Sequence, residues 1–148
     1  MLVQNKQPLI LVDWSNADDK KRYFILRALE GRSLTLLQEV KAIYEYNCPR
    51  VHQVFLLRLK ASLPAVCRPI IITDAGFKVP WLKQIRKLGW HYIARVRGNQ
   101  TLQLPDSLTF ISVGEFYKKT RTTPQCLGKI KLTTSQRDVT TAVLVGTP

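Results

Sequence analysis

Two aspartates, Asp13 and Asp74, each follow a short run of apolar and β-branched residues. Residues 9–12 read Leu-Ile-Leu-Val, and residues 69–73 read Pro-Ile-Ile-Ile-Thr. Strands that end on a carboxylate can hold Mg²⁺ or Mn²⁺, because these ions prefer hard oxygen ligands. Two such ions can activate a water or a 3′-hydroxyl and stabilise the leaving oxygen of a phosphodiester. We therefore take both aspartates as candidate catalytic residues and metal ligands, with Asp13 bridging two ions and Asp74 holding one.

A simpler interpretation of the same aspartates stays open. An aspartate before Ala75 and Gly76 is typical of a turn, and Asp13 could likewise be a structural turn or cap residue. A two-metal site also normally has at least one further acidic ligand. The only glutamate after Asp74 is Glu115.

The first half of the chain predicts three strands and a helix. Strands are expected at residues 9–14, 22–29 and 33–40, and the last two should pair as an antiparallel hairpin about Gly31. A helix of three to four turns should begin at Pro49 and end before Pro64, because the apolar residues between them recur at helical spacing. They are Phe55, Leu56, Leu59 and Leu63.

A strand, a helix and a further strand follow. Residues 69–73 are almost wholly apolar, which is typical of a strand covered on both faces. Pro80 suits the first turn of a helix that Gly89 ends, and residues 90–96 form the next strand. The order is typical of an α/β fold with a ribonuclease-H-like mixed sheet, in which the first and fourth strands are neighbours. Asp13 and Asp74 would then meet at one edge.

Beyond Gly98 the pattern is weaker. Residues 112–119 predict a short helix, and residues 127–133 with 139–145 predict the strands of a hairpin.

The net charge of +13 is concentrated after residue 50. Residues 1–50 hold 8 Lys and Arg against 6 Asp and Glu, a net of +2, whereas residues 51–148 hold 15 against 4, a net of +11. A region this basic favours polyanions, chiefly nucleic acid. A ribosome-associated or merely soluble basic protein is the alternative.

The remaining composition predicts a soluble cytoplasmic protein without a membrane segment. No apolar run approaches the roughly 18 residues that a spanning helix needs, and polar residues 4–7 interrupt any signal-peptide pattern. Cys48, Cys67 and Cys126 are an odd number of cysteines at wide spacings and form no CxxC pair. A zinc site or a disulfide framework is therefore not expected.

Several basic and aromatic residues are candidates for DNA contacts. Arg95 and Arg97 alternate at the end of a strand and so share a face, where they could contact phosphates. Lys78 follows Asp74 closely and is a third candidate, although lysines of the helix it precedes would also suit a solvated face. The tryptophans beside the aspartates could stack on bases, but buried packing is the favoured interpretation. The run Lys118, Lys119 and Arg121 would add nonspecific affinity, and His52 and His91 are taken as structural.

Four segments closely resemble one protein family, in the same order and at similar spacing. They are Leu11-Val12-Asp13-Trp14-Ser15, Gly31-Arg32-Ser33-Leu34-Thr35-Leu36, Thr73-Asp74-Ala75-Gly76-Phe77-Lys78-Val79-Pro80-Trp81, and Leu88-Gly89-Trp90 with Arg95-Val96-Arg97-Gly98. They are similar to DDE transposases of the insertion-sequence-four family, and within it to the transposase of insertion sequence ten. The resemblance covers residues 8–98 and fades afterwards.

The resemblance implies that Asp13 and Asp74 match the first and second catalytic aspartates. It implies a ribonuclease-H-like catalytic core, of which residues 1–98 are the N-terminal part, and a β-rich insertion that begins in residues 99–148. The implied reaction is Mg²⁺-dependent cleavage of transposon ends through a DNA hairpin, then joining of the 3′-hydroxyls to target DNA, with Mn²⁺ as a substitute. The implied partners are double-stranded DNA and a second transposase chain, because the family acts as dimers.

The chain departs from the family pattern in two ways. The third carboxylate of the family is a glutamate on a helix after the insertion, and Glu115 does not match its motif. The N-terminal region that recognises transposon ends also has no counterpart. We therefore expect a truncated catalytic domain with an incomplete core and with inefficient or absent transposition. Two alternatives stay open: a noncatalytic DNA-binding remnant that interferes with an intact transposase, and an unfolded decay product with exposed apolar surface.

Overall fold

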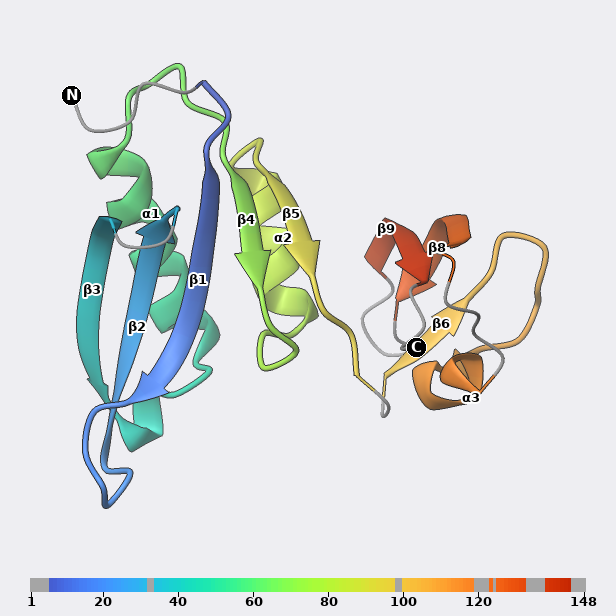
Figure 1. Cartoon of the computed structure of the whole chain (residues 1–148), viewed down its shortest axis with the longest axis horizontal. Coiled ribbons are helices and arrows are strands. Elements are labelled where there is room, and N and C mark those ends of the chain that lie inside the picture. The colour runs from blue at the N-terminus through green and yellow to red at the C-terminus, as the bar shows by residue number, and fades with distance from the viewer. Residues whose placement is uncertain are drawn as a thin grey trace. The chain divides into compact units, whose positions relative to one another are not determined.

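The computed structural model describes residues 6–31, 34–97, 100–118, 123, 125–132 and 138–144. The chain divides into two compact units, Met1–Arg95 and Val96–Pro148 (Figure 1). Some residues named above lie outside the described residues. These are Arg32, Ser33, Gly98, Lys119 and Arg121.

The first unit is built on a mixed five-stranded sheet. Its strands are β1 (Leu9–Asn16), β2 (Tyr23–Glu30), β3 (Leu34–Ala42), β4 (Ile70–Thr73) and β5 (His91–Ala94). The order is β3-β2-β1-β4-β5; β2 is antiparallel to both β1 and β3, while β4 runs parallel to β1 and to β5. The first and fourth strands are therefore neighbours, as the sequence predicted. This arrangement is compatible with a ribonuclease-H-like transposase fold.

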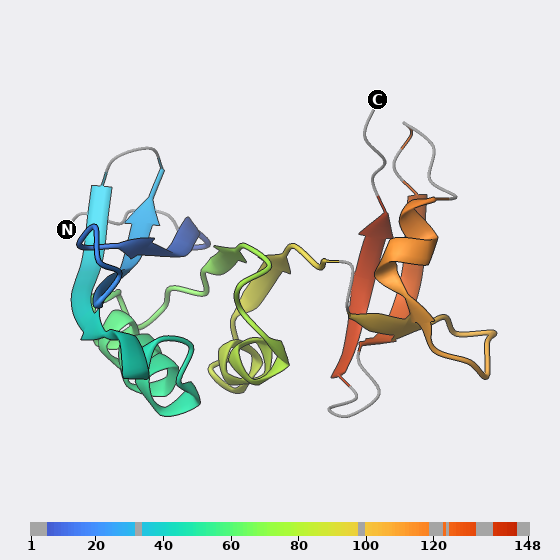
Figure 2. The same cartoon turned by 90° about the horizontal axis from the view of Figure 1, so that it is seen from below.

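Two helices and a short 3-10 turn connect these strands. Helix α1 (Pro49–Ser62) and helix α2 (Val79–Lys87) each carry a proline in the first turn, where the missing N–H is not needed. The turn η1 (Ile43–Glu45) follows β3. Helix α2 ends before Gly89, whose φ of 74° is the left-handed conformation that glycine adopts readily. Both helices lie against the same face of the sheet (Figure 2).

That face, which we call the covered face, holds the core of the first unit. Ile10 and Val12 of β1 alternate with exposed neighbours and are fully buried, as is Ile71 of β4. They face the apolar stripes of the helices, in which Phe55, Leu59 and Ile85 are also fully buried. Each such side chain stabilises the fold by about 1.5–3 kcal/mol through burial.

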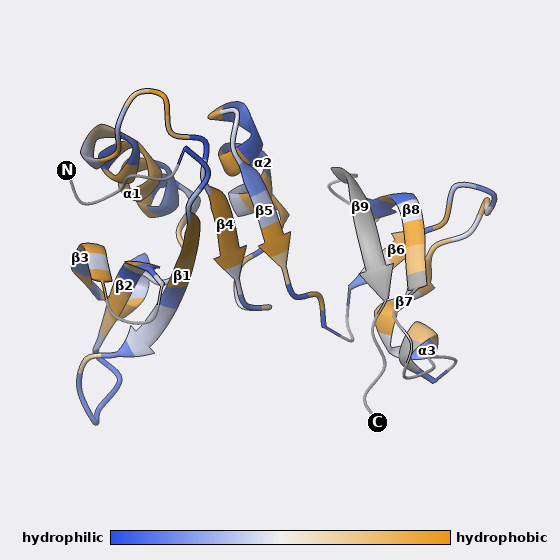
Figure 3. Ribbon diagram, turned by 45° about the horizontal axis from the view of Figure 1, so that its top comes forward, coloured by the Kyte–Doolittle hydropathy of each residue, from blue (hydrophilic) through white to orange (hydrophobic). Residues whose placement is uncertain are grey.

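The other face of the sheet, which we call the open face, is only partly covered. Leu9 and Leu11 of β1 are 52% and 40% exposed, and Ile93 of β5 is 58% exposed. The prediction that β4 is covered on both faces is wrong, because Ile70 and Ile72 are only half-buried. The reason is that both connecting helices lie on the same side. Figure 3 shows hydrophobic colouring on β4 and on parts of β1 and β5.

The second unit is an antiparallel sheet with one short helix. Its strands are β6 (Thr101–Gln103), β7 (Ile111–Ser112), β8 (Gln125–Leu132) and β9 (Asp138–Leu144), in the order β7-β6-β8-β9. Leu102, Val113 and Ile130 form its buried cluster. The predicted hairpin is present as β8 and β9, and the predicted helix is α3 (Val113–Tyr117). Strands β6 and β7 were missed because three and two residues are too few to show a period.

No helix within the described ranges is long and apolar enough to cross a membrane.

Candidate metal and DNA site

Asp13 and Asp74, which we call the carboxylate pair, lie just past the last paired residues of the neighbouring strands β1 and β4. Asp13 is inside β1, and Asp74 directly follows β4. The ladder between β1 and β4 pairs Val12 with Thr73, so each aspartate is the next residue along its chain. Asp13 follows buried Val12 in the alternation of β1 and therefore points to the open face. Both aspartates are exposed. The register thus brings together two carboxylates that are 61 positions apart in the sequence.

The pKa of Asp13 is raised from its usual value, with burial the main cause and the charge of Asp74 another. Partial burial raises the pKa of Asp13, the backbone N–H of Trp14 lowers it, the charge of Asp74 raises it, and Arg27 lowers it, with a net increase. Like charges that lie near each other favour the protonated form of one of them. A cation bound between them would remove this repulsion.

The loop after β4 holds Asp74 in a tight turn. The backbone N–H of Gly76 donates a hydrogen bond to Asp74 Oδ1 over 2.8 Å. A Cβ atom at position 76 would lie 3.0 Å from the same oxygen. The glycine therefore leaves room for the carboxylate beside the backbone. Asp74 is thus a turn residue, which is the simpler of the two roles that its sequence context suggested. This role is compatible with binding a metal, because Gly76 donates to Oδ1 and not to Oδ2.

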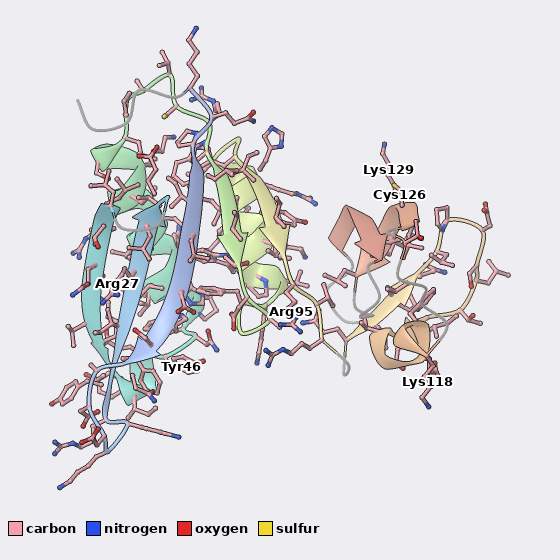
Figure 4. The ribbon with its side chains drawn as sticks, in the orientation of Figure 1. Arg27, Tyr46, Arg95, Lys118, Cys126 and Lys129 are labelled. Atoms are coloured by element: carbon pink, nitrogen blue, oxygen red, sulfur yellow. The ribbon has the colours of Figure 1, made fainter. Side chains whose placement is uncertain are left out.

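Cationic side chains flank the carboxylate pair on both sides. Arg27 of β2 pairs with Asp13 across the antiparallel ladder, and its Nε donates to Gln38 Oε1 over 2.9 Å. Arg95 follows β5 directly, and its backbone N–H donates to the carbonyl of Thr73 over 3.2 Å. Figure 4 labels both arginines, Arg27 on β2 and Arg95 just after β5. Across the sheet, the order of charges is therefore Arg27, Asp13, Asp74 and Arg95: one cation, two anions and a second cation.

The structure separates the three predicted DNA contacts. Arg95 belongs to the first unit and is exposed beside the residue that precedes Asp74. Lys78 is also exposed and stands at the N-cap of α2, four residues after Asp74. Arg97 is exposed but belongs to the second unit, so its relation to the carboxylate pair stays a prediction.

Sequence reasoning missed Arg27. Nothing in its residue type or in the strand around it indicates a role, and its position opposite Asp13 follows only from the pairing of β1 with β2. The sequence feature that bears on this pairing is the length of the loop between β1 and β2. Loop length helps to set the register of two paired strands, but a loop of this length allows several registers.

Aromatic rings pack behind the carboxylate pair on the covered side. Trp14 contacts the rings of Phe24, Tyr46 and His52, and His52 also contacts Phe77 and Trp81. Trp81 is buried, as predicted, whereas Trp14 is only half-buried because it lies near the end of β1. His52 is buried and His91 is exposed.

The donor set fits a hard divalent ion that keeps several of its waters. Two exposed carboxylates supply the oxygen ligands that Mg²⁺ prefers, and Mg²⁺ is commonly held by one or two carboxylates plus substrate phosphate. Within the described part of the chain, no group of three or more His, Cys, Asp or Glu could enclose a metal ion. Cys48, Cys67 and Cys126 are not in disulfides; Cys67 is buried and Cys126 exposed.

The comparison with known families identifies the chain. The family model described as the transposase DDE domain matches residues 46–145, which is more than half of the sequence, so the chain belongs to this family. The matched range includes Asp74 and begins after β3, so it does not reach Asp13. No curated protein and no solved structure shows significant similarity to the chain.

Membership of this family indicates a role in DNA transposition. It implies a DNA substrate, and members of the family generally depend on divalent metal ions. The basic charge of the chain and the two carboxylates agree with both properties.

Proposed function

We propose that the chain provides part of the catalytic core of a DDE transposase of the insertion-sequence-four type, closest to that of insertion sequence ten. The observation that carries this proposal is the carboxylate pair, one residue past the end of the parallel ladder between β1 and β4 and flanked by Arg27 and Arg95. Asp13 and Asp74 would hold Mg²⁺, or Mn²⁺ in its place. The metal would activate the attacking oxygen and stabilise the leaving oxygen during phosphodiester cleavage.

The cations of the site would orient the DNA backbone. Arg27 and Arg95 would each contact a phosphate on one side of the carboxylate pair, because a guanidinium can bind two phosphate oxygens at once. Lys78 and Arg97 would add phosphate contacts without reading sequence. Their shared effect is to hold a scissile phosphate near two negative charges that would otherwise repel it.

The chain by itself would cleave DNA slowly or not at all. Among the described residues no third acid joins the carboxylate pair, and DDE chemistry uses three. Full transposition would then need a homodimer or pairing with an intact transposase that supplies the missing carboxylate. In this proposal the chain is a partial catalytic domain rather than an independent enzyme.

Nicking of supercoiled plasmid DNA tests the proposal. The purified chain is compared with Asp13→Asn and Asp74→Asn in Mg²⁺ and in Mn²⁺. Asn keeps the size of the side chain, and at position 74 it can still accept the hydrogen bond from Gly76. Asp106→Asn is the matched control, since Asp106 is an exposed acid in a loop of the second unit. We expect weak metal-dependent nicking that falls to background in both site variants and persists in the control. Nicking that survives in both site variants would refute the role of the pair.

A second candidate function is noncatalytic DNA binding. The observation that favours it is the combination of a net charge of +13 with only two acids at the site, among the residues that the structure describes. It predicts no nicking by any variant, but DNA binding that weakens steeply with salt and is unchanged in Asp74→Asn. Such a remnant could compete with an intact transposase for DNA or pair with it.

A further inference from the structure

His52 of α1 lies at the centre of the aromatic packing behind the carboxylate pair. Its side chain is 3% exposed. Its ring centroid is 5.0 Å from that of Trp81, 5.4 Å from that of Phe77 and 6.0 Å from that of Trp14. Its Nε2 accepts a hydrogen bond from the indole Nε1–H of Trp14 over 3.3 Å.

The residues that His52 contacts are close to the two aspartates in the sequence. Trp14 directly follows Asp13, and Phe77 is the third residue after Asp74. One side chain of α1 therefore contacts both segments that carry the carboxylates.

This contact matters because the backbone ladder ends before the aspartates. The last pair between β1 and β4 is Val12 with Thr73. Beyond it, Asp13 continues to pair only with Arg27 of β2, and Asp74 enters the turn closed by Gly76. The distance between the two carboxylates is thus left to side-chain packing, and Trp14, His52 and Phe77 form the path that joins them.

A histidine suits this position for a chemical reason. Burial lowers the pKa of His52 to about 4, so the imidazole is neutral at pH 7 and Nε2 can accept the Trp14 proton. An apolar residue of similar size could pack against the rings but would leave the indole N–H without its acceptor, which is unfavourable for a half-buried donor. A second-layer group that orients a ligand-bearing segment in this way tunes metal affinity without touching the metal.

We propose that His52 is a positioning residue of the carboxylate pair, which sets the spacing of Asp13 and Asp74 through the Trp14 hydrogen bond and the Phe77 ring contact. This inference rests on the proposed function, because the spacing matters for a metal held by both aspartates. It adds a residue, His52, that lies outside the carboxylate pair and on which metal binding would depend.

Mn²⁺ binding to the full chain, measured by titration calorimetry, is the first test. His52→Leu and Trp14→Phe should each weaken Asp74-dependent binding by about tenfold or more, as changes in a second layer of ligands commonly do. His52→Gln should retain most of the affinity, since its Oε1 can replace Nε2 as the acceptor. The double variant that combines His52→Leu with Trp14→Phe should be no weaker than the single variants, because both remove the same hydrogen bond. Trp90→Phe is the control, since Trp90 is also buried but directly precedes the opposite end of β5.

Backbone hydrogen exchange provides a second measurement that does not need the metal. In His52→Leu, exchange should accelerate at residues 74–77 and at Trp14, while the strands of the second unit keep their protection. Thermal unfolding shows whether each variant is folded at the temperature used. Wild-type exchange at these positions in folded His52→Leu, or Mn²⁺ affinity in His52→Gln as low as in His52→Leu, would overturn the proposal.

The two measurements separate the failure of this inference from the failure of the proposed function. If the wild-type chain shows no Asp74-dependent Mn²⁺ binding, the proposed function fails, and the exchange pattern alone then decides whether His52 positions the two segments. If wild-type binding depends on Asp74 but not on His52, the proposed function stands and the positioning role is refuted.

Discussion

The two faces of the five-stranded sheet differ in what their side chains do. The covered face places Ile10, Val12 and Ile71 against α1 and α2 and leaves them fully buried. On the open face, the residues that alternate with them in β1 are Leu9, Leu11 and Asp13, all exposed. One strand thus contributes core residues on one side and a candidate metal ligand on the other. Because successive side chains of a strand point to opposite faces of the sheet, each residue of β1 belongs to either the covered face or the open face.

The same difference separates the carboxylate pair from the rings behind it. The carboxylate pair is exposed, whereas His52, Phe77 and Trp81 behind it are buried and Trp14 is half-buried. A change on the covered side should therefore act on both stability and function, and a change on the open side mainly on function. Four experiments test this contrast between the two faces.

The largest effect on stability is expected at Ile71. Ile71→Ala removes a fully buried side chain of β4 and should lower the free energy of unfolding by about 2–5 kcal/mol. Ile93→Ala, on the open face of β5 at 58% exposure, should change it by only about 0.5 kcal/mol. Urea unfolding followed by circular dichroism measures both. Equal losses would mean that the open face is covered in solution, for example by a second chain.

Acid should weaken the fold through His52. Burial lowers its pKa to about 4 in the folded chain, from 6.5 for a solvated histidine, so between these pH values the unfolded chain binds the extra proton. Stability is therefore full above pH 6.5 and is lost progressively as the pH falls to about 4, by about 3 kcal/mol at most. His52→Gln should show a flatter dependence in this range. An identical pH profile in the two proteins would contradict the burial of a neutral histidine.

Gly76→Ala should disturb the site with little effect on the fold. The added Cβ would lie 3.0 Å from Asp74 Oδ1 and would displace the carboxylate. We expect Mn²⁺ affinity to fall by about tenfold, the lower end of the effect of changes next to metal ligands, with an unfolding midpoint close to that of wild type. Unchanged affinity would show that the turn tolerates the methyl group or that Asp74 binds no metal. Ala75→Gly is a suitable control for the flexibility of the same turn.

The smallest effect is expected from an ion pair at the edge of the covered face. Glu39 Oε1 accepts a hydrogen bond from Arg58 of α1 over 2.8 Å, and Lys41 lies 2.9 Å from Oε2. Although burial raises the pKa of Glu39, these two cations hold it below its usual value. Arg58→Ala should cost no more than about 1 kcal/mol, because the arginine side chain is 61% exposed and Lys41 remains. A loss of several kcal/mol in the same urea assay would show that this pair anchors α1.

Much of the fold follows from local pattern. The strand that carries Asp13, the helix between Pro49 and Pro64, and the helix that Gly89 ends were all predicted within a few residues, because period and end signals are local properties. The prediction of a covered β4 failed for the opposite reason. An apolar run shows that a strand can be buried, but the side on which its connecting helices lie is a property of the whole unit.

Residue types and their spacing were enough to predict the candidate carboxylates, the order of elements in the first unit and the basic character of the chain. The folded chain was needed to see that Arg27 lies opposite Asp13, that Arg95 follows β5 beside Thr73, and that His52 contacts the segments of both aspartates. Residue type and spacing determine conformation over only a few residues. Contacts across a sheet or between helix and strand depend instead on register and packing among segments that are distant in the chain.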